Sequence, residues 1–224
     1  MAIRKTSFIV GEYYHVYNRG VDKRVIFNDN NDYRRFMALL YLCNGTESVV
    51  MRPLHNYQGV PLVVKIFSFE RGEQLVDIGS YCLMPNHFHI LVTERVEGGI
   101  SQFMEKLATA YVMYFNTKNE RRGSLFEGPF KVKHIDSDSY LNWVFSYIHL
   151  NPVKLVDSNW KESGISNPTA VKDFINDYKY SSYSDYFLGD RTESVILNKE
   201  TFSDDFTQLN DLDELIKEFR EGDY

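Results

Sequence analysis

The chain has 224 residues, 43% hydrophobic and 25% charged, which is typical of a globular protein with a substantial core. Its two cysteines, Cys43 and Cys82, lie far apart, and the N-terminus lacks the long apolar run of a signal peptide, which argues against a disulfide-stapled secreted domain and favours a cytoplasmic protein. No segment approaches the roughly 18 consecutive apolar residues of a membrane helix, so no membrane partner is expected.

The net charge of −6 is distributed unevenly along the chain. Residues 1–154 carry 18 Lys and Arg against 15 Asp and Glu, whereas residues 155–224 carry 7 against 16. The acidity therefore belongs to the C-terminal part. The first part permits binding to a nucleic acid without requiring it.

The predicted elements of the first half are mostly strands. Aromatic and polar residues alternate over Tyr13–Asn18, which predicts a strand, and Asn28-Asp29-Asn30 can cap a helix over about residues 32–42. Three further segments follow: a β-rich run over 62–69 and strands over 75–84 and 87–93, the last two separated by a Pro85-Asn86 turn.

The second half predicts mostly helices. An amphipathic helix over about 101–117 precedes a basic loop over 119–134 with a short strand at its end. Ser137 or Asp138 can cap a helix over about 140–150, and weaker helical patterns appear at 169–178 and 211–220. The order β-α-β-β-α-β followed by α predicts an α+β, ferredoxin-like sandwich with an antiparallel sheet. We expect one domain over residues 1–156 and an acidic, partly helical C-terminal extension over 157–224 without an assigned role.

The sequence MPNHFHILV at 84–92 contains the first candidate site. Side chains alternate between the two faces of a strand, so His87 and His89 project from one face and Phe88 from the other. Two imidazoles about 7 Å apart along a strand can bind one cation and leave several coordination positions open. A histidine pair of this spacing also occurs by chance, so this motif needs support from elsewhere in the chain.

The helix over 140–150 contains the second candidate site. Tyr147 and Asn151 are four residues apart and lie on one helix face. A phenol with a pKa near 10 is a poor nucleophile at pH 7, but a cation that polarises a phosphate can activate it, and the Asn151 amide oxygen can serve as a third ligand. Tyr140, seven residues earlier, lies on nearly the same face and is the competing nucleophile.

Four segments together resemble the single-tyrosine HUH transposases of bacterial insertion sequences, and most closely the REP-associated tyrosine transposases. They are YHVYNRG at 14–20, YCLMPNHFHILV at 81–92, GSLFEGPFKVK at 123–133 and YIHLNPVK at 147–154. They occur in the family's order, and the resemblance covers about residues 8–156. The combination of MPNHFHILV with YIHLNPVK is its most specific part.

The resemblance implies a transposase and nicking endonuclease in the bacterial cytoplasm, associated with the nucleoid. It implies that residues 1–156 form an HUH endonuclease domain, that His87 and His89 bind Mg²⁺ or Mn²⁺, and that Tyr147 forms a 5′-phosphotyrosine intermediate. Asn151 would be the third metal ligand, where other members carry glutamine. The implied partner is single-stranded or hairpin DNA. The sequence leaves open whether the chain acts as a monomer or as a homodimer.

Further residues are candidates for contact with DNA. Basic side chains near the first strand and in the basic loop can contact phosphates, which fixes register without reading bases; they are Arg19, Lys23, Arg24, Arg121, Arg122, Lys131 and Lys133. Phe126 and Phe130 can stack on unpaired bases or anchor the loop to the core. His15 is a candidate for lining the site or for the core, and His149 for packing or a phosphate contact.

Two other functions remain open at this level. In a metal-dependent hydrolase, water would replace Tyr147 as the nucleophile and no covalent adduct would form. A non-catalytic or domesticated hairpin-binding protein would use the same fold without cutting DNA.

Overall fold

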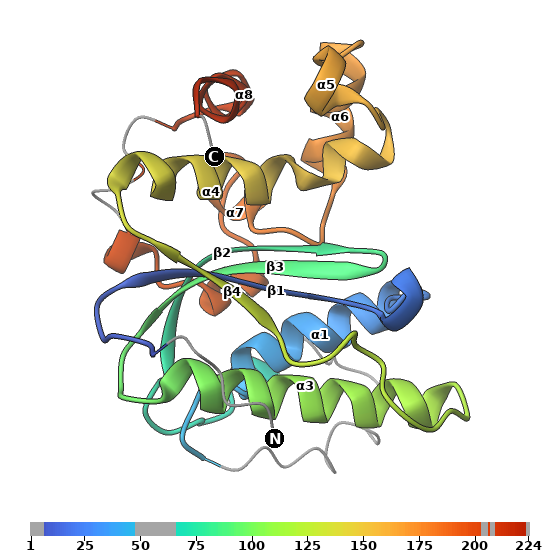
Figure 1. Ribbon diagram of the computed structural model, residues 1–224, viewed down its shortest axis with the longest axis vertical. Helices are drawn as coiled ribbons and strands as arrows, with labels where there is room; N and C mark the ends of the chain where they lie inside the picture. Colours follow the sequence, from blue (N-terminus) through green and yellow to red (C-terminus); the bar gives the residue numbers. More distant parts are fainter. Residues whose placement is uncertain (1–6, 48–65, 203–205, 207–208, 223–224) are drawn as a thin grey trace.

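The computed structural model describes residues 7–47, 66–202, 206 and 209–222. It is an α+β fold built on one four-stranded sheet with strand order β2-β3-β1-β4 (Figure 1). The strands are β1 (Tyr13–Arg19), β2 (Val76–Met84), β3 (His87–Glu94) and β4 (Lys131–Ile135). Every neighbouring pair is antiparallel, which confirms the predicted fold class and its antiparallel sheet.

Helices α1 (Asn30–Leu42) and α3 (Gly99–Lys118) cover one face of the sheet (Figure 1). The Asp29 side chain caps α1 by accepting hydrogen bonds from the backbone N–H groups of Asn31 and Asp32. Apolar side chains from both helices pack against alternate residues of the strands, including Val16, Phe88 and Ile90, to form the larger core. Apolar side chains therefore fill the space between this face of the sheet and the two helices.

Helix α4 (Asp138–Leu150) covers the opposite face, and the helix α8 (Leu212–Glu221) lies on α4 as a further layer (Figure 1). Ser137 caps α4, its hydroxyl accepting from the N–H of Tyr140, which decides between the two caps considered above. Val144, Phe145 and Ile148 are fully buried beneath it. These residues form the second core together with side chains from the C-terminal segment.

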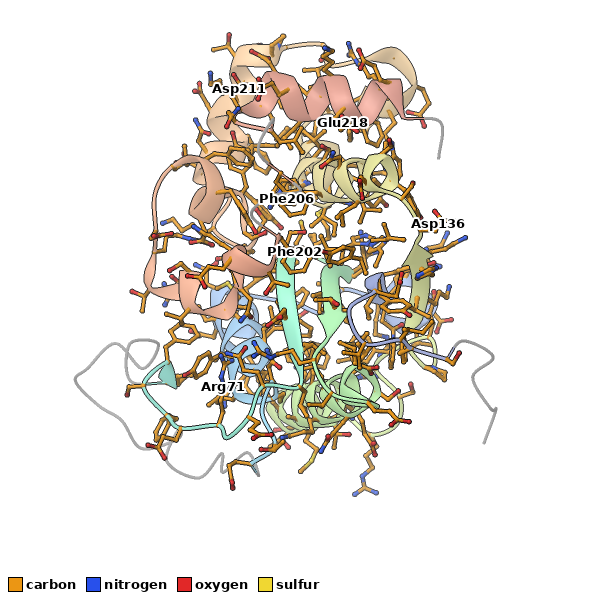
Figure 2. The ribbon with its side chains drawn as sticks, turned by 90° about the vertical axis from the view of Figure 1, so that its left-hand side faces the viewer. Arg71, Asp136, Phe202, Phe206, Asp211 and Glu218 are labelled. Atoms are coloured by element: carbon orange, nitrogen blue, oxygen red, sulfur yellow. The ribbon has the colours of Figure 1, made fainter. Side chains whose placement is uncertain are left out.

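The C-terminal segment packs closely on this second face. Phe206 stacks on Phe145 with ring centroids 3.8 Å apart and on Phe202 at 6.0 Å (Figure 2). The remaining short elements are α5 (Trp160–Ser163), α6 (Pro168–Asp177), α7 (Tyr183–Phe187) and the 3₁₀ helices Val21–Lys23, Asn151–Leu155, Thr192–Ile196 and Lys199–Phe202. The division into two domains at residue 156 stays a prediction.

The two edges of the sheet are covered differently. Along β2, residues 180–182 bind the outer edge: Leu83 N–H donates to the Tyr180 carbonyl, Ser182 N–H to the Tyr81 carbonyl, and Tyr81 N–H to the Ser182 hydroxyl. Strand β4 is the other edge and pairs only with β1 within the described residues. Its residues are mostly exposed.

Two differences from the predicted elements concern local structure. Of the β-rich run at 62–69, residues 62–65 lie outside the described residues, and Ile66–Phe69 form a helix end and turn rather than a strand. The prediction of strand at Ile66–Phe69 is wrong because Ile66 packs against Ala38 and Leu42 of α1 instead of joining the sheet. In the described part of the chain, no helix is long and apolar enough to cross a membrane.

Candidate active site

Strand β3 places two histidines on the α4 face of the sheet. The register pairs His89 with Tyr17 of β1 and Cys82 of β2, and the rings of His87 and His89 lie with centroids 5.1 Å apart and nearly perpendicular. The turn before β3 is fixed, because Gly20 N–H donates to the Asn86 carbonyl. Alternation along the strand therefore brings both imidazoles to one face.

Hydrogen bonds select which ring nitrogen of each histidine stays free. The Asn86 side-chain oxygen lies 2.6 Å from Nδ1 of His87, so this nitrogen carries the proton and donates. Nδ1 of His89 lies 2.8 Å from Nε2 of buried His15. His15 thus stands behind His89 and does not line the cavity described below. In both cases Nε2 is the nitrogen left to bind a cation.

Burial keeps these imidazoles neutral. It lowers the pKa of His87 to about 4, with a hydrogen bond to Asn151 opposing the shift and the charges of Arg19, Lys154 and Lys161 adding to it. Burial also lowers the pKa of His89 well below its usual value, assisted by the neighbouring histidines and by Lys161. Neutral imidazoles offer the lone pairs that metal binding needs.

Helix α4 brings Tyr147 to the histidines of the same chain. The Tyr147 ring lies 5.3 Å from the His89 ring, centroid to centroid, at 85°. Trp143, one turn earlier, stacks on Tyr147 at 5.1 Å with an interplanar angle of 9°. Tyr140 contacts Trp143 and is not among the residues that line the cavity. The geometry therefore distinguishes the two candidate tyrosines.

Asn151 lies where α4 ends, and it is buried at 5% exposure. Its side-chain N–H donates to the backbone carbonyl of Tyr147 at 2.9 Å, which leaves the amide oxygen as the atom that can bind a cation. Burial raises the pKa of Tyr147, and a hydrogen bond with the Asn151 side chain opposes that shift. The phenol is therefore protonated at neutral pH and needs activation to act as a nucleophile.

These residues share one open cavity of about 730 Å³. It is lined by five basic side chains and no acidic one, although the whole chain has a net charge of −6. The basic residues are Arg19, Lys23, Lys131, Lys154 and Lys161. The other lining residues are Tyr17, Asn18, Val25, Met84, Pro85, Asn86, His87, His89, Tyr147, Asn151 and Leu155. Such a cavity favours an anionic ligand.

Only three of the basic residues predicted to contact DNA line this cavity. Arg19, Lys23 and Lys131 line the cavity, whereas Arg24, Arg121, Arg122 and Lys133 do not. Arg121 instead donates to the Asn116 side chain near the end of α3. Lys154 and Lys161 line the cavity without having been predicted. Lys154 could have been noticed because it belongs to the motif YIHLNPVK, whereas no sequence signal marks Lys161.

The remaining candidates lie elsewhere. His149 is fully buried and its Nε2 lies 2.7 Å from the Ser182 hydroxyl, so it packs on the C-terminal segment. Phe126 is buried in the larger core, which favours its role as a loop anchor. Phe130 is partly buried and stacks on Phe8 at 6.5 Å. Both rings line a second, separate cavity of about 290 Å³ beside α3.

The donor set fits a divalent cation of modest size. Two imidazole nitrogens and an amide oxygen combine a borderline donor with a hard one, a set compatible with Mn²⁺ or Mg²⁺ when phosphate oxygens and water complete the shell. The described residues contain no cluster of three or more His, Cys, Asp or Glu side chains that could hold a metal.

Comparison with known proteins finds a similarity in the central part of the chain. Residues 62–151 match the family model "Transposase IS200 like", a span that contains β2, β3, α3, β4 and α4. Among curated proteins, none matches the sequence. The solved structure of a REP-associated tyrosine transposase bound to a REP hairpin aligns with 83% of this chain and 85% of its own, with 12% identity and a TM-score of 0.46. Residues 62–151 are thus similar to the IS200-like transposases, and this span contains both histidines, Tyr147 and Asn151.

Proposed function

We propose that this protein is a metal-dependent DNA strand transferase that cuts and rejoins single-stranded or hairpin DNA through Tyr147. The observation that carries the proposal is the meeting of one tyrosine, two neutral histidines and an amide in a cavity lined by five cations and no carboxylate. Metal ligands beside a phenol fit phosphoryl transfer to the protein itself. The basic lining fits a phosphodiester backbone.

In the proposed reaction, the Tyr147 oxygen attacks the phosphorus of one phosphodiester. The bond from phosphorus to the 3′-oxygen breaks, the phenol proton passes to solvent, and the leaving 3′-oxygen takes up a proton. The downstream strand remains joined to Tyr147 through its 5′-phosphate. Because the phosphodiester is exchanged and not hydrolysed, a 3′-hydroxyl can later attack the phosphotyrosine and rejoin DNA.

The chain's own residues have distinct roles in this proposal. His87, His89 and Asn151 hold the cation, Mg²⁺ or Mn²⁺, while Asn86 and His15 orient the two imidazoles. A divalent cation held by these residues would supply Lewis-acid polarisation of the phosphate and would favour the phenolate. Trp143 stacks on Tyr147 and restricts the orientation of its ring. Arg19, Lys23 and Lys131 contact the flanking phosphates.

The test is covalent capture with Mn²⁺ and hairpin oligonucleotides labelled at either end. The 3′-labelled fragment should migrate with the protein on a denaturing gel, and the 5′-labelled fragment should be released with a free 3′-hydroxyl. Tyr147→Phe should reduce adduct formation on the order of 10³-fold or more, since no other group forms the bond. Tyr140→Phe, the same change on the same helix, should retain it.

The alternatives give different results in this experiment. Release of both labelled fragments without an adduct would identify a hydrolase. Hairpin binding without cleavage in Mn²⁺ would identify a non-catalytic or domesticated binder. An adduct that persists in Tyr147→Phe and disappears in Tyr140→Phe would move the nucleophile to Tyr140.

A further inference from the structure

A lysine outside the matched family region lies against the nucleophile. Lys161 belongs to α5, ten residues beyond the span 62–151. Its Nζ lies 4.3 Å from the centroid of the Tyr147 ring and 5.6 Å from that of Phe219. It lines the same cavity as the two histidines. The C-terminal segment therefore contributes a charged group to the candidate active site.

The backbone around Lys161 is anchored on both sides. Trp160, the preceding residue, is 2% exposed and packs on Phe219 with ring centroids 4.8 Å apart. The chain that follows α5 is tied back because the backbone N–H and hydroxyl of Ser166 both donate to the Asp157 carboxylate at 2.8 Å. Phe219 is itself fixed, since the Trp143 indole N–H donates to its carbonyl at 3.1 Å. The position of Lys161 is thus set by packing.

Among the described residues, Lys161 makes no ion pair with a carboxylate, although the charge of the adjacent Glu162 acts on it. Arg19 and Lys131 in the same cavity share Glu127, whereas no described carboxylate forms an ion pair with Lys161. Instead, it shares one cavity with both histidines and lies against the Tyr147 ring. Burial among the rings and the charge of Lys154 lower the pKa of Lys161 itself, while its side chain still reaches solvent. Its surroundings are cationic and aromatic.

This arrangement is unfavourable unless an anion binds. A lysine near two imidazoles repels a metal ion bound to them, and five cations around one cavity repel each other. A phosphate between Lys161 and the histidines reverses both effects, because it attracts the metal and the lysine together. The charge distribution therefore favours a phosphate-containing ligand, and Lys161 lies beside Tyr147, with its Nζ 4.3 Å from the ring centroid.

We propose that Lys161 is a catalytic residue that binds a non-bridging oxygen of the phosphate attacked by Tyr147, an inference that rests on the proposed function. Lys161 neutralises charge on the phosphate as the bond from the Tyr147 oxygen forms and the bond to the 3′-oxygen breaks. It transfers no proton. The role belongs to the C-terminal segment, so the complete site extends beyond the span that the family model matches.

The experiment compares Lys161→Met, Lys161→Arg and Lys172→Met in the full-length chain with Mn²⁺. Lys172 is an exposed lysine on α6, so its variant makes the same charge change away from the cavity. Single-turnover adduct formation should fall about 10²-fold in Lys161→Met, with DNA affinity changed less than about 3-fold. Lys161→Arg should recover most of the rate, and Lys172→Met should match wild type.

A second measurement separates catalysis from packing. Oligonucleotides with sulfur at either non-bridging position of the scissile phosphate should slow wild type, and Lys161→Met should lose that effect for one stereoisomer only. A purely structural role for Lys161 would leave the sulfur effects of both isomers unchanged in the variant, which would overturn the inference. Equal rates for wild type and Lys161→Met would also overturn it while leaving the proposed function intact. Absence of an adduct from wild type would overturn both.

Discussion

Strand β3 separates two regions with different physical properties. On one face, Phe88, Ile90 and Val92 are at most 2% exposed and pack with α1 and α3 into a core. On the other, His87 and His89 reach an open cavity beneath α4 that is lined by cations. Phe88, Ile90 and Val92 thus stabilise the fold, whereas His87 and His89 line the candidate site and Leu91, on that same face, packs into the second core. The comparison suggests that the site can be changed with little loss of stability, because the opposite face carries most of the apolar burial.

The largest expected effect is the loss of adduct formation when either histidine on the cavity face is substituted. His87→Ala and His89→Ala should each reduce adduct formation by about 10³-fold, because each removes a nitrogen ligand from the proposed cation. A Mn²⁺ titration monitored by electron paramagnetic resonance should show weaker binding in both variants. The free energy of unfolding should change by less than about 1 kcal/mol. Wild-type rates or wild-type Mn²⁺ affinity in either variant would disprove the metal assignment.

The next effect is on the core face, at the residue between the two histidines. Phe88→Ala should lower the free energy of unfolding by about 3 kcal/mol in urea, because it leaves a cavity beside Phe36 and Phe126. Adduct formation per folded molecule should stay within a few-fold of wild type. A large loss of specific activity at full folding would show that the two faces are coupled.

The last effect appears only on acidification and concerns a histidine remote from the cavity. Burial lowers the pKa of His149 to about 3, so the folded chain excludes a proton that the unfolded chain accepts near pH 6.5. Stability should therefore fall as the pH drops below 6.5, by about 1.4 kcal/mol per pH unit from this residue until its folded pKa is reached. When the free energy of unfolding is measured in urea between pH 6 and 4, His149→Gln should reduce its slope against pH by about 1.4 kcal/mol per pH unit. An unchanged slope would mean that His149 is not held neutral in the fold.

Local patterns predicted most of the fold. Alternation located β1, β2 and β3, while Asp29 and Ser137 as caps located the starts of α1 and α4. Side-chain alternation also predicted that His87 and His89 share one face. These features depend on neighbours in sequence, which is why a single chain reveals them.

Features that depend on tertiary packing were not predictable. Lys161 reaches Tyr147 only because Trp160 is buried against Phe219, which lies about sixty residues away in sequence. The sequence could place His15 on a strand next to that of His89. It could not predict the hydrogen bond between the two rings, because this contact depends on the register of the two strands. Ile66 was assigned to a strand by composition, and its contacts with α1 override that preference.

The unequal edges of the sheet limit how copies of the chain can associate. Within the described residues, residues 180–182 pair with the backbone of Tyr81 and Leu83 on β2, which leaves β4 as the edge open to strand addition from another molecule. A sheet with one open edge can pair with one other molecule through that edge. When two copies pair through their open edges, neither copy has an open edge left. Backbone pairing between copies would therefore stop at a closed pair, and growth into fibres by this route is blocked.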